Sequence, residues 1–489
     1  MLFNSIHFLV FFPVVTLLYF ISPHKYRWLL LLAASCYFYM AFIPAYILIL
    51  AITIVIDYFA GIYIERSEGK KKKKYLIISI ISLCMVLFVF KYFNFVNQNL
   101  AALSDIFYVE YPISNLGLIL PIGLSFHTFQ SLSYVVEVYR GKQKAERHFG
   151  LYSLYVMFYP QLVAGPIERP QQLLYQFYEH HKYDYKRITD GLKLMTWGMF
   201  KKVVIADRLA VFVNQVYDNP QNYEGISSVI ATVFFAFQIY CDFSGYTDIA
   251  IGAANVMGFK LMQNFNRPYF SKSISEFWKR WHISLSTWFR DYLYIPLGGN
   301  KVPIPRWYFN LFITFLVSGL WHGANWTFVI WGALHGTYLI IGIVTREFRV
   351  KFVKAIGLDK QRTLHRFIQT MITATLVSFS WIFFRAVDFS DALHIFKSIF
   401  TGIGNIAGIF GPERMHVLYL DRNMFDFSVC VFLIMFLGIV ELIQRRGSII
   451  EMINQKPAVY RWILYYLILI AILLFGQYDL TQRFIYFQF

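Results

Sequence analysis

The sequence predicts an all-α polytopic membrane protein, and three observations lead to this prediction. Of the 489 residues, 57% are apolar, 20% are aromatic and only 15% are charged, whereas about a quarter of the residues of a soluble chain are charged. The apolar residues gather in long stretches. Because one spanning helix takes about 20 residues, the chain has room for about ten or more transmembrane helices and their loops.

The charge balance fits a membrane protein better than a nucleic-acid-binding protein. There are 45 Lys and Arg against 28 Asp and Glu, a net charge of +17. The basic residues fall in short runs between apolar stretches, as expected when positive loops stay in the cytoplasm. Four cysteines (Cys36, Cys84, Cys241 and Cys430) stand singly in apolar segments. We therefore predict buried thiols, no metal site and no nucleic-acid partner.

The first hundred residues predict a series of spanning helices. Leu2–Ile21 has no basic residue before it and no small-residue cleavage pattern after it, so it is interpreted as a retained span. Trp28–Ile64 is too long for one helix and is expected to fold back near Pro44. Basic residues follow the first span at Pro23–Arg27 and the third at Lys70–Lys74, where a loop is expected. This pattern places the N-terminus outside.

The middle of the chain predicts broken helices. After a span at Tyr75–Val96, the apolar segments become shorter and are interrupted at Pro121, Pro160 and Pro166. Irregular backbone at membrane depth requires surrounding protein or a water-filled cavity. The segment Asn264–Arg306 is too polar to span, so re-entrant or interfacial helices are expected there.

The last third predicts further spans. Tyr308–Val344 must form two helices for the same reason of length. Three more apolar runs follow, at Thr370–Phe384, Phe427–Leu442 and Trp462–Phe475. The basic loop Arg445–Arg461 indicates a cytoplasmic position, which sends the C-terminal tail outside. We expect one membrane domain over 1–489, with N-terminal spans (1–97), a core of broken helices (98–345) and C-terminal spans (346–489).

His322 is the first candidate for catalysis. It stands about fourteen residues into the apolar run that begins at Tyr308, hence about 20 Å along a helix and near mid-membrane depth. A neutral imidazole there could accept and donate a proton. Trp321 and Asn325 beside it are candidate substrate-binding residues. The alternative is a structural histidine bonded across a helix interface. His335 would point about 140° away on a continuous helix and is not expected to share the site.

A second candidate region is the polar segment Glu276–Asp291. It contains His282, and Glu276–Arg280 and Thr287–Asp291 have the four-residue spacing of helix-face pairs. Its composition suits an interfacial helix with an aromatic belt, and equally the wall of a polar tunnel. The candidate substrate-binding residues in it are Trp281, Ser284, Ser286 and Arg290.

A third polar cluster, Asp242–Asp248, is interpreted as interhelical hydrogen bonding, because its two aspartates are six apart and do not share a helix face. The sequence contains no phosphate-binding loop, dinucleotide fingerprint or serine-hydrolase elbow. A donor that carries its own activation, such as a thioester, would need none of these.

The motif Trp321-His322-Gly323, together with Trp281-His282-Ile283-Ser284, resembles the membrane-bound O-acyltransferase (MBOAT) family. The chain is similar in particular to the bacterial branch that includes alginate O-acetyltransferase membrane subunits, peptidoglycan O-acetyltransferases and D-alanyl transfer proteins. Further matching stretches are Pro121–Gln130, Gln161–Ile167, Asp242–Asp248 and Asn264–Tyr269.

The resemblance implies a ring of about 11–12 transmembrane helices around a central funnel, with His322 as central catalytic residue and His282 as its companion. It implies acetyl-CoA, or an acyl carrier protein, as donor, with no bound cofactor. It also implies an extracytoplasmic esterase-like transferase as partner. The C-terminal sequence Phe484–Phe489 resembles a pattern in which a tyrosine hydroxyl, here that of Tyr486, relays the acyl group. The alternative for this tail is an aromatic membrane anchor.

The expected function is therefore O-acetylation of an extracytoplasmic polysaccharide from the bacterial inner membrane, in contact with membrane lipid. The acceptor is left open between an alginate-like polymer and peptidoglycan. The alternatives are D-alanyl transfer to teichoic acid, a transporter or flippase for a polysaccharide precursor, and a scaffolding subunit. A transporter would show the same pattern of broken helices in its sequence.

Overall fold

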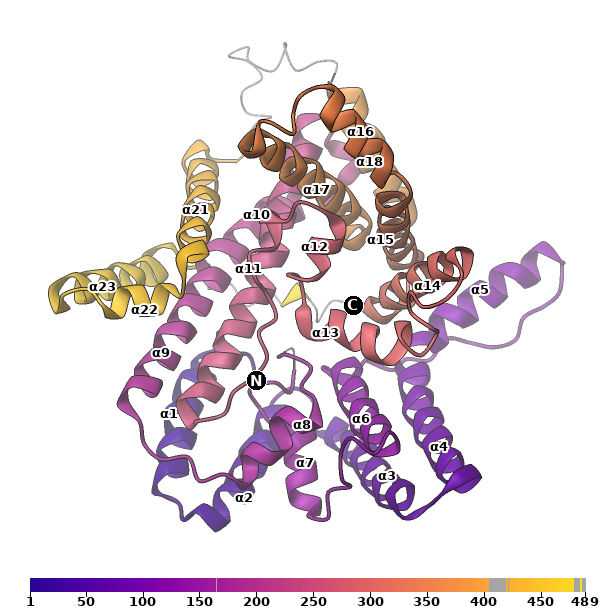
Figure 1. Cartoon of the computed structure of the whole chain (residues 1–489), viewed down its shortest axis with the longest axis vertical. Coiled ribbons are helices and arrows are strands. Elements are labelled where there is room, and N and C mark those ends of the chain that lie inside the picture. Colours follow the sequence, from indigo (N-terminus) through magenta and orange to yellow (C-terminus); the bar gives the residue numbers. More distant parts are fainter. Residues whose placement is uncertain (164, 404–418, 421, 479–483, 486–489) are drawn as a thin grey trace. The chain divides into compact units, whose positions relative to one another are not determined.

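The computed structural model describes residues 1–163, 165–403, 419–420, 422–478 and 484–485, and every regular element in them is helical (Figure 1). Within this part of the chain, seven helical runs are long and apolar enough to span a membrane: Pro44–Arg66, Gly69–Ile106, Ile226–Met257, Trp326–Val344, Arg362–Arg385, Met424–Arg446 and Ala458–Phe475. The all-α polytopic fold is thus confirmed. The larger number of spans and their arrangement around a funnel stay predictions.

The helices form two compact units. One comprises Met1–Met195 and Tyr246–Gln263, and the other comprises Thr196–Gly245 and Asn264–Phe489. The single membrane domain, with its boundaries near residues 97 and 345, stays a prediction.

The first unit contains the N-terminal helices. They are α1 (Ile6–Ile21), α2 (His24–Met40), η1 (Pro44–Tyr46), α3 (Ile47–Arg66), α4 (Gly69–Leu87), η2 (Phe88–Tyr92), α5 (Phe93–Ile106), α6 (Leu124–Tyr139), α7 (Phe149–Met157), α8 (Pro170–Leu173), η3 (Leu174–Tyr178) and most of α9 (Tyr185–Met199). The predicted fold-back near Pro44 is confirmed, because α2 ends at Met40 and η1 begins at Pro44.

The expected lysine loop is wrong. Helix α4 begins at Gly69, so Lys70–Lys74 are helical, and only Ser67 and Glu68 separate α3 from α4. Lysine is a good helix former, and its side chains remain exposed within a helix as well as within a loop. The run of positive charges therefore indicated where the preceding span ends but did not predict the secondary structure of Lys70–Lys74.

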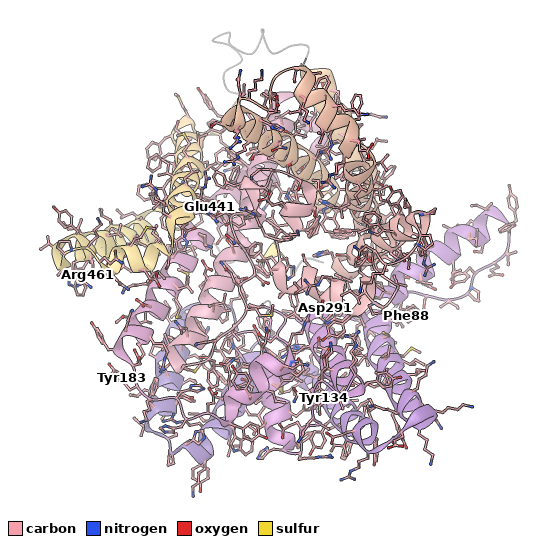
Figure 2. All side chains as sticks on the ribbon, viewed as in Figure 1. Phe88, Tyr134, Tyr183, Asp291, Glu441 and Arg461 are labelled. Carbon is pink, nitrogen blue, oxygen red and sulfur yellow. The ribbon has the colours of Figure 1, made fainter. Side chains whose placement is uncertain are left out.

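Tyrosines dominate the interior of the first unit. Tyr134, labelled in Figure 2, is fully buried on α6, and its ring packs against that of Tyr152 on α7 with centroids 4.5 Å apart. Gly61 on α3 makes room for it, because a Cβ there would lie 2.7 Å from the Tyr134 hydroxyl. Helices α3, α6 and α7 thus share one aromatic core.

The second unit contains the remaining helices. They are η4 (Phe200–Ala206), α10 (Asp207–Tyr217), η5 (Pro220–Asn222), the first part of α11 (Ile226–Met257), η6 (Pro268–Phe270), α12 (Ile274–Trp278), α13 (Ile283–Phe289), η7 (Arg290–Tyr294), α14 (Ile304–His322), α15 (Trp326–Val344), α16 (Arg346–Ala355), α17 (Arg362–Arg385), α18 (Phe389–Ile403), α21 (Met424–Ile443), η8 (Gln444–Arg446), α22 (Ile449–Asn454) and α23 (Ala458–Phe475).

Several predicted elements of this unit are confirmed. Tyr308–Val344 is two helices, α14 and α15, and the three later apolar runs fall in α17, α21 and α23. The polar segment Asn264–Arg306 forms short helices and turns up to Pro303, and its last three residues begin α14. Helix α23 has no buried residue, and Figure 2 shows its side chains, with Arg461 labelled, projecting from the ribbon. An apolar helix with this exposure fits a surface that faces lipid.

Candidate active site

His322 is the last residue of α14, where the chain turns into α15. The turn is only three residues long, Gly323 to Asn325, and Asn325 caps the next helix by accepting the Thr327 N–H through its side chain at 3.0 Å. Its Nδ2 also donates to the Val387 carbonyl at 3.0 Å. The structure therefore gives Asn325 a role in shaping the hairpin, and its contact with substrate stays a prediction.

Glycines bring the two helices of this hairpin into close contact (Figure 1). A Cβ at Gly319 would lie 2.2 Å from the Phe328 carbonyl oxygen, and one at Gly332 would lie 2.4 Å from the Phe315 carbonyl oxygen. At Gly323 a Cβ would lie 2.1 Å from the Phe328 ring. The space beside His322 that these glycines leave is filled by α15, which explains them without a substrate.

Aromatic rings surround the His322 imidazole, whose residue is 5% exposed. The ring centroids of Trp321, Trp331 and Phe384 lie 5.0, 5.1 and 5.2 Å from it. These side chains come from α14, α15 and α17, so three helices hold the imidazole in place. Its depth in a bilayer stays a prediction.

His335 has a structural position. Its Nδ1 accepts the Trp278 indole N–H at 3.2 Å, and its Nε2 lies 2.9 Å from the Ser380 hydroxyl. Because an indole nitrogen can only donate, the proton of a neutral His335 lies on Nε2. The continuous helix expected between His322 and His335 is wrong, because α14 ends at His322 and α15 begins at Trp326. The Trp331 ring, 4.9 Å from that of His335, contacts both histidines.

His282 is the residue before α13 and is fully buried. Its backbone is left-handed, with φ of 42°, a conformation that costs energy in residues other than glycine. Asn264 supports this turn, because its carbonyl accepts the Ile283 N–H at 2.9 Å and its side-chain oxygen accepts the Ser284 hydroxyl at 2.6 Å. Burial lowers the pKa of His282 to about 3, so its imidazole is neutral near pH 7.

The two candidate histidines share a neighbour. The Trp321 ring lies 5.0 Å from the His322 ring and 6.4 Å from the His282 ring. On its other side, the His282 ring packs edge-on against Phe243 of α11 at 4.6 Å. The structure thus brings Trp321, His322 and His282 into one cluster, and their catalytic and substrate-binding roles stay predictions.

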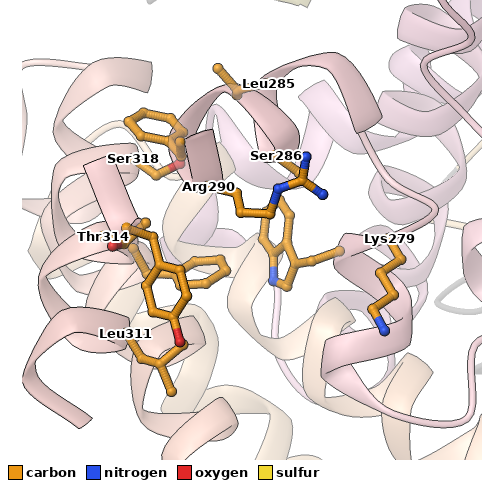
Figure 3. Close-up of a pocket in the computed structure, with 11 residues that line it drawn as sticks. Lys279, Leu285, Ser286, Arg290, Leu311, Thr314 and Ser318 are labelled. Atoms are coloured by element: carbon orange, nitrogen blue, oxygen red, sulfur yellow. The ribbon is translucent and has the colours of Figure 1, made fainter. Parts of the chain in front are cut away.

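The other predicted binding residues separate into two groups. Trp281 is buried and stacks on Phe277 with centroids 5.4 Å apart, and Ser284 is buried against Asn264. Ser286 and Arg290 instead line a cavity of about 180 Å³. Figure 3 labels both residues among those that line the cavity, together with Lys279 and with Leu311, Thr314 and Ser318 of α14. The relay residue Tyr486 lies outside the described residues.

The cavity approaches His322 without including it. Ser318, which lines the cavity, is one helical turn before His322 on α14, and residues four apart lie on the same helix face. Neither His322 nor His282 is among the lining residues. The predicted Glu276–Arg280 pair closes at 2.5 Å. The Thr287 hydroxyl, however, donates to the Ile283 and Ser284 carbonyls and not to Asp291, because these acceptors are within its own helical turn.

Sequence reasoning missed a buried ionic group next to this cluster. Lys202 lies 2.7 Å from a carboxylate oxygen of Asp207 and 2.7 Å from one of Asp242. All three residues are buried. The interhelical bonding expected for Asp242 is thereby confirmed. The partners of Asp242 could have been found in the sequence, because Lys201, Lys202 and Asp207 stand within an apolar stretch. Ionisable residues in such stretches usually have a structural or functional role.

The described residues contain no cluster of side chains that could form a metal site. No group of three or more His, Cys, Asp or Glu side chains gathers there in a way that could hold an ion.

Comparisons with known proteins give a consistent result. A model of the family described as MBOAT, membrane-bound O-acyltransferase family, matches residues 16–355. The chain is 39% identical over 404 residues to a probable alginate O-acetylase of Azotobacter vinelandii, covering 82% of this chain and 78% of that one. It is 35% identical to a peptidoglycan O-acetyltransferase of Helicobacter pylori, covering 87% and 83%. A teichoic acid D-alanyltransferase of Streptococcus thermophilus is 29% identical and covers 49% and 60%.

Proposed function

The chain belongs to the membrane-bound O-acyltransferase family, and from this premise we propose that it transfers an acetyl group from cytoplasmic acetyl-CoA for O-acetylation of an extracytoplasmic polysaccharide. The enzyme class and the multi-pass membrane location follow from the family and from the seven apolar helices of the described residues. The proposal adds the acyl group, the donor, the acceptor side and the residues that act.

The choice of an acetyl group is supported by the relatives and by the cavity. Two relatives that match most of the chain are named for O-acetyl transfer, whereas the D-alanyltransferase matches about half of it. The cavity one helical turn from His322 has about 180 Å³. That volume can hold a short acyl group. D-alanyl transfer from an acyl carrier protein is the alternative within the same chemistry.

In this proposal His322 is the general base. Its neutral imidazole takes the proton of the accepting hydroxyl while that oxygen attacks the thioester carbonyl carbon. The carbon–sulfur bond then breaks, and the departing thiolate receives the proton back from the imidazolium. His282 is neutral because burial lowers its pKa, so it can donate one ring N–H to the developing oxyanion. Trp321 neighbours both imidazoles, so its ring helps to hold them in one cluster.

The observation that carries this proposal is the position of His322. A buried histidine at a hairpin tip is held by aromatic rings from three helices, one helical turn from a cavity that can hold a small group. Fixed orientation of this kind is what a general base requires. Ser286 and Arg290 are proposed to bind substrate, because their side chains face that cavity.

The remaining elements of the proposal concern sides and partners. The protein is placed in the bacterial inner membrane with both termini outside, because the basic segments favour the cytoplasm. The same basic segments favour the phosphates of the donor electrostatically. The acetyl group leaves through a sugar hydroxyl or through Tyr486 and reaches an extracytoplasmic esterase-like transferase, which modifies an alginate-like polymer or peptidoglycan.

The test is release of the CoA thiol by the purified protein. His322→Gln, which keeps a polar side chain but cannot shuttle a proton, should lower the rate 10²–10⁴-fold, the usual effect of losing a positioned base. The matched control is His365→Gln, at a half-buried histidine of α17, which should keep the rate of the unaltered protein. Unchanged thiol release in His322→Gln would refute the assignment.

The same assay separates the alternative functions. A transporter or flippase would release no thiol, and a scaffolding subunit would tolerate replacement of both His322 and His282. Hydroxylamine-labile acetylation of Tyr486 after exposure to donor tests the relay, and a tail peptide without this adduct would exclude it.

A further inference from the structure

A buried charged group binds the C-terminal tail of the protein. Asp242 Oδ2 accepts the backbone N–H of Ile485 at 2.8 Å, although 243 residues separate the two in the sequence. The other oxygen of the same carboxylate is 2.7 Å from Lys202 Nζ. Phe484 and Ile485 are each 2% exposed. A chain end that is this well covered and hydrogen-bonded is docked.

The composition of the charged group explains why it binds an N–H donor. Lys202 is one cation against two carboxylates, Asp207 and Asp242, and these residues are at most 5% exposed. A buried carboxylate is stable only when hydrogen bonds satisfy it in addition to its ion pair. The backbone N–H of Ile485 supplies such a bond, and hydrogen bonds to an ionised acceptor are about twice as strong as neutral ones.

The docked tail leads toward the histidine cluster. The ring of Phe484 lies 5.9 Å from that of Phe243, and the ring of Phe243 lies 4.6 Å from that of His282. Phe243 follows Asp242 on α11, so two adjacent residues of one helix hold the tail and pack against the second candidate histidine.

We propose that Asp242, oriented by Lys202, is a positioning residue that fixes the C-terminal segment at Ile485, next to the Phe484–Phe243 ring contact, and that acyl transfer at the histidine cluster depends on this anchor. This inference rests on the proposed function for its catalytic consequence, whereas the docking of the tail is a separate claim with its own measurement.

Docking is measured by the reactivity of a cysteine in the tail. Ile485→Cys keeps the backbone N–H that Asp242 accepts. The natural Cys36, which is half-buried, and Cys84, which is exposed, are replaced by serine, since the burial predicted for these two thiols is wrong. We expect slow maleimide labelling of this protein and labelling at least tenfold faster after Asp242→Ala. Asp242→Asn keeps an acceptor oxygen and should retain most of the protection. Equal labelling rates in Asp242→Ala and in its parent would overturn the anchor.

A matched control is available at a second buried carboxylate. Glu441 on α21, labelled in Figure 2, is 5% exposed and accepts a hydrogen bond from the Tyr240 hydroxyl. Glu441→Gln changes a buried carboxylate to an amide without touching the tail, so labelling at position 485 should stay slow. Fast labelling in this variant would mean that general loosening, and not loss of the anchor, exposes the tail, and would count against the proposal.

Catalytic positioning is tested by a double-mutant cycle on acetyl transfer to an added acceptor. Asp242→Ala should lower kcat about tenfold or more with the KM for acetyl-CoA unchanged, and removal of residues 484–489 should have the same effect. In the truncated chain, Asp242→Ala should add nothing further, because the two changes remove one interaction. Additive losses would identify a merely structural role for Asp242 and would refute positioning.

The two claims fail differently. If no form of the protein releases thiol while labelling still depends on Asp242, the proposed function fails and the anchor stands. If thiol release depends on His322 but neither labelling nor kcat responds to Asp242→Ala, the anchor fails and the proposed function stands.

Discussion

Gly319→Ala tests how closely α14 and α15 approach each other beside His322. The added Cβ would lie 2.2 Å from the Phe328 carbonyl oxygen and 3.2 Å from the Gly332 Cα. A carbon and a carbonyl oxygen in contact are normally about 3.3–3.6 Å apart. Both neighbouring groups are backbone, so no side chain can rotate away. The two helices must therefore separate by about 1 Å or one of them must bend.

The expected loss of stability combines two opposing effects. Overpacking of this kind costs about 1–3 kcal/mol, while alanine favours a helix over glycine by about 1 kcal/mol. The net change is a destabilisation of about 0–2 kcal/mol. The effect on catalysis is larger, because His322 stands three residues beyond Gly319 on the same helix, and a shift of about 1 Å in a catalytic group can lower the rate about 10²-fold.

The assay pairs thermal unfolding in detergent with thiol release, and the control is Gly342→Ala. Gly342 is also in the hairpin, on α15, but nothing lies within 4 Å of a Cβ built there. This variant should be as active as its parent and at least as stable. If Gly319→Ala were equally stable and equally active, the close backbone approach, and the positioning of His322 that depends on it, would be refuted.

Three further changes test separate parts of the second unit. Asn325→Ala removes the cap of α15 and should destabilise the protein by about 1 kcal/mol in thermal unfolding, whereas Asn325→Asp keeps the capping oxygen, loses only the exposed hydrogen bond to the Val387 carbonyl, and should cost less. The pKa of His282 is lowered to about 3 in the folded protein, from about 6.5 in the unfolded chain. The free energy of unfolding should therefore fall by about 1.4 kcal/mol per pH unit as the pH drops from 6.5 towards 3. This contribution to the slope should be absent in His282→Gln. Lys202→Met leaves two buried carboxylates without their cation and should cost about 3–5 kcal/mol, measured by denaturation; a loss below 1 kcal/mol would contradict the buried ion pair.

Much of the fold could be predicted from hydrophobic length alone. A stretch such as Tyr308–Val344 is too long to cross a bilayer once, so it must contain two helices, and α14 and α15 confirm this. Where the chain turns is decided by local chemistry. Asn325 is a good capping residue, and Pro44 begins a short helix after the fold-back. The lysine run failed as a loop signal because charge reports exposure and not backbone conformation.

The candidate site could be predicted in its residues but not in its geometry. Trp321, His322 and His282 were recognised as ionisable or amphipathic groups in unusual surroundings, and the structure brings them together. The structural roles of Asn325 and Ser284 could not be foreseen, because a polar side chain has the same composition whether it caps a helix or faces a substrate.

Composition and hydrophobic periodicity by themselves determined that this protein is helical and crosses a membrane many times, since both depend on the free energy of moving each side chain out of water. Tertiary structure alone decided which charges meet. Lys202 and Asp242 are forty residues apart, and Ile485 is far from both. Whether such groups form an ion pair or a docking site depends on distances of a few ångströms, which the packing of whole helices sets.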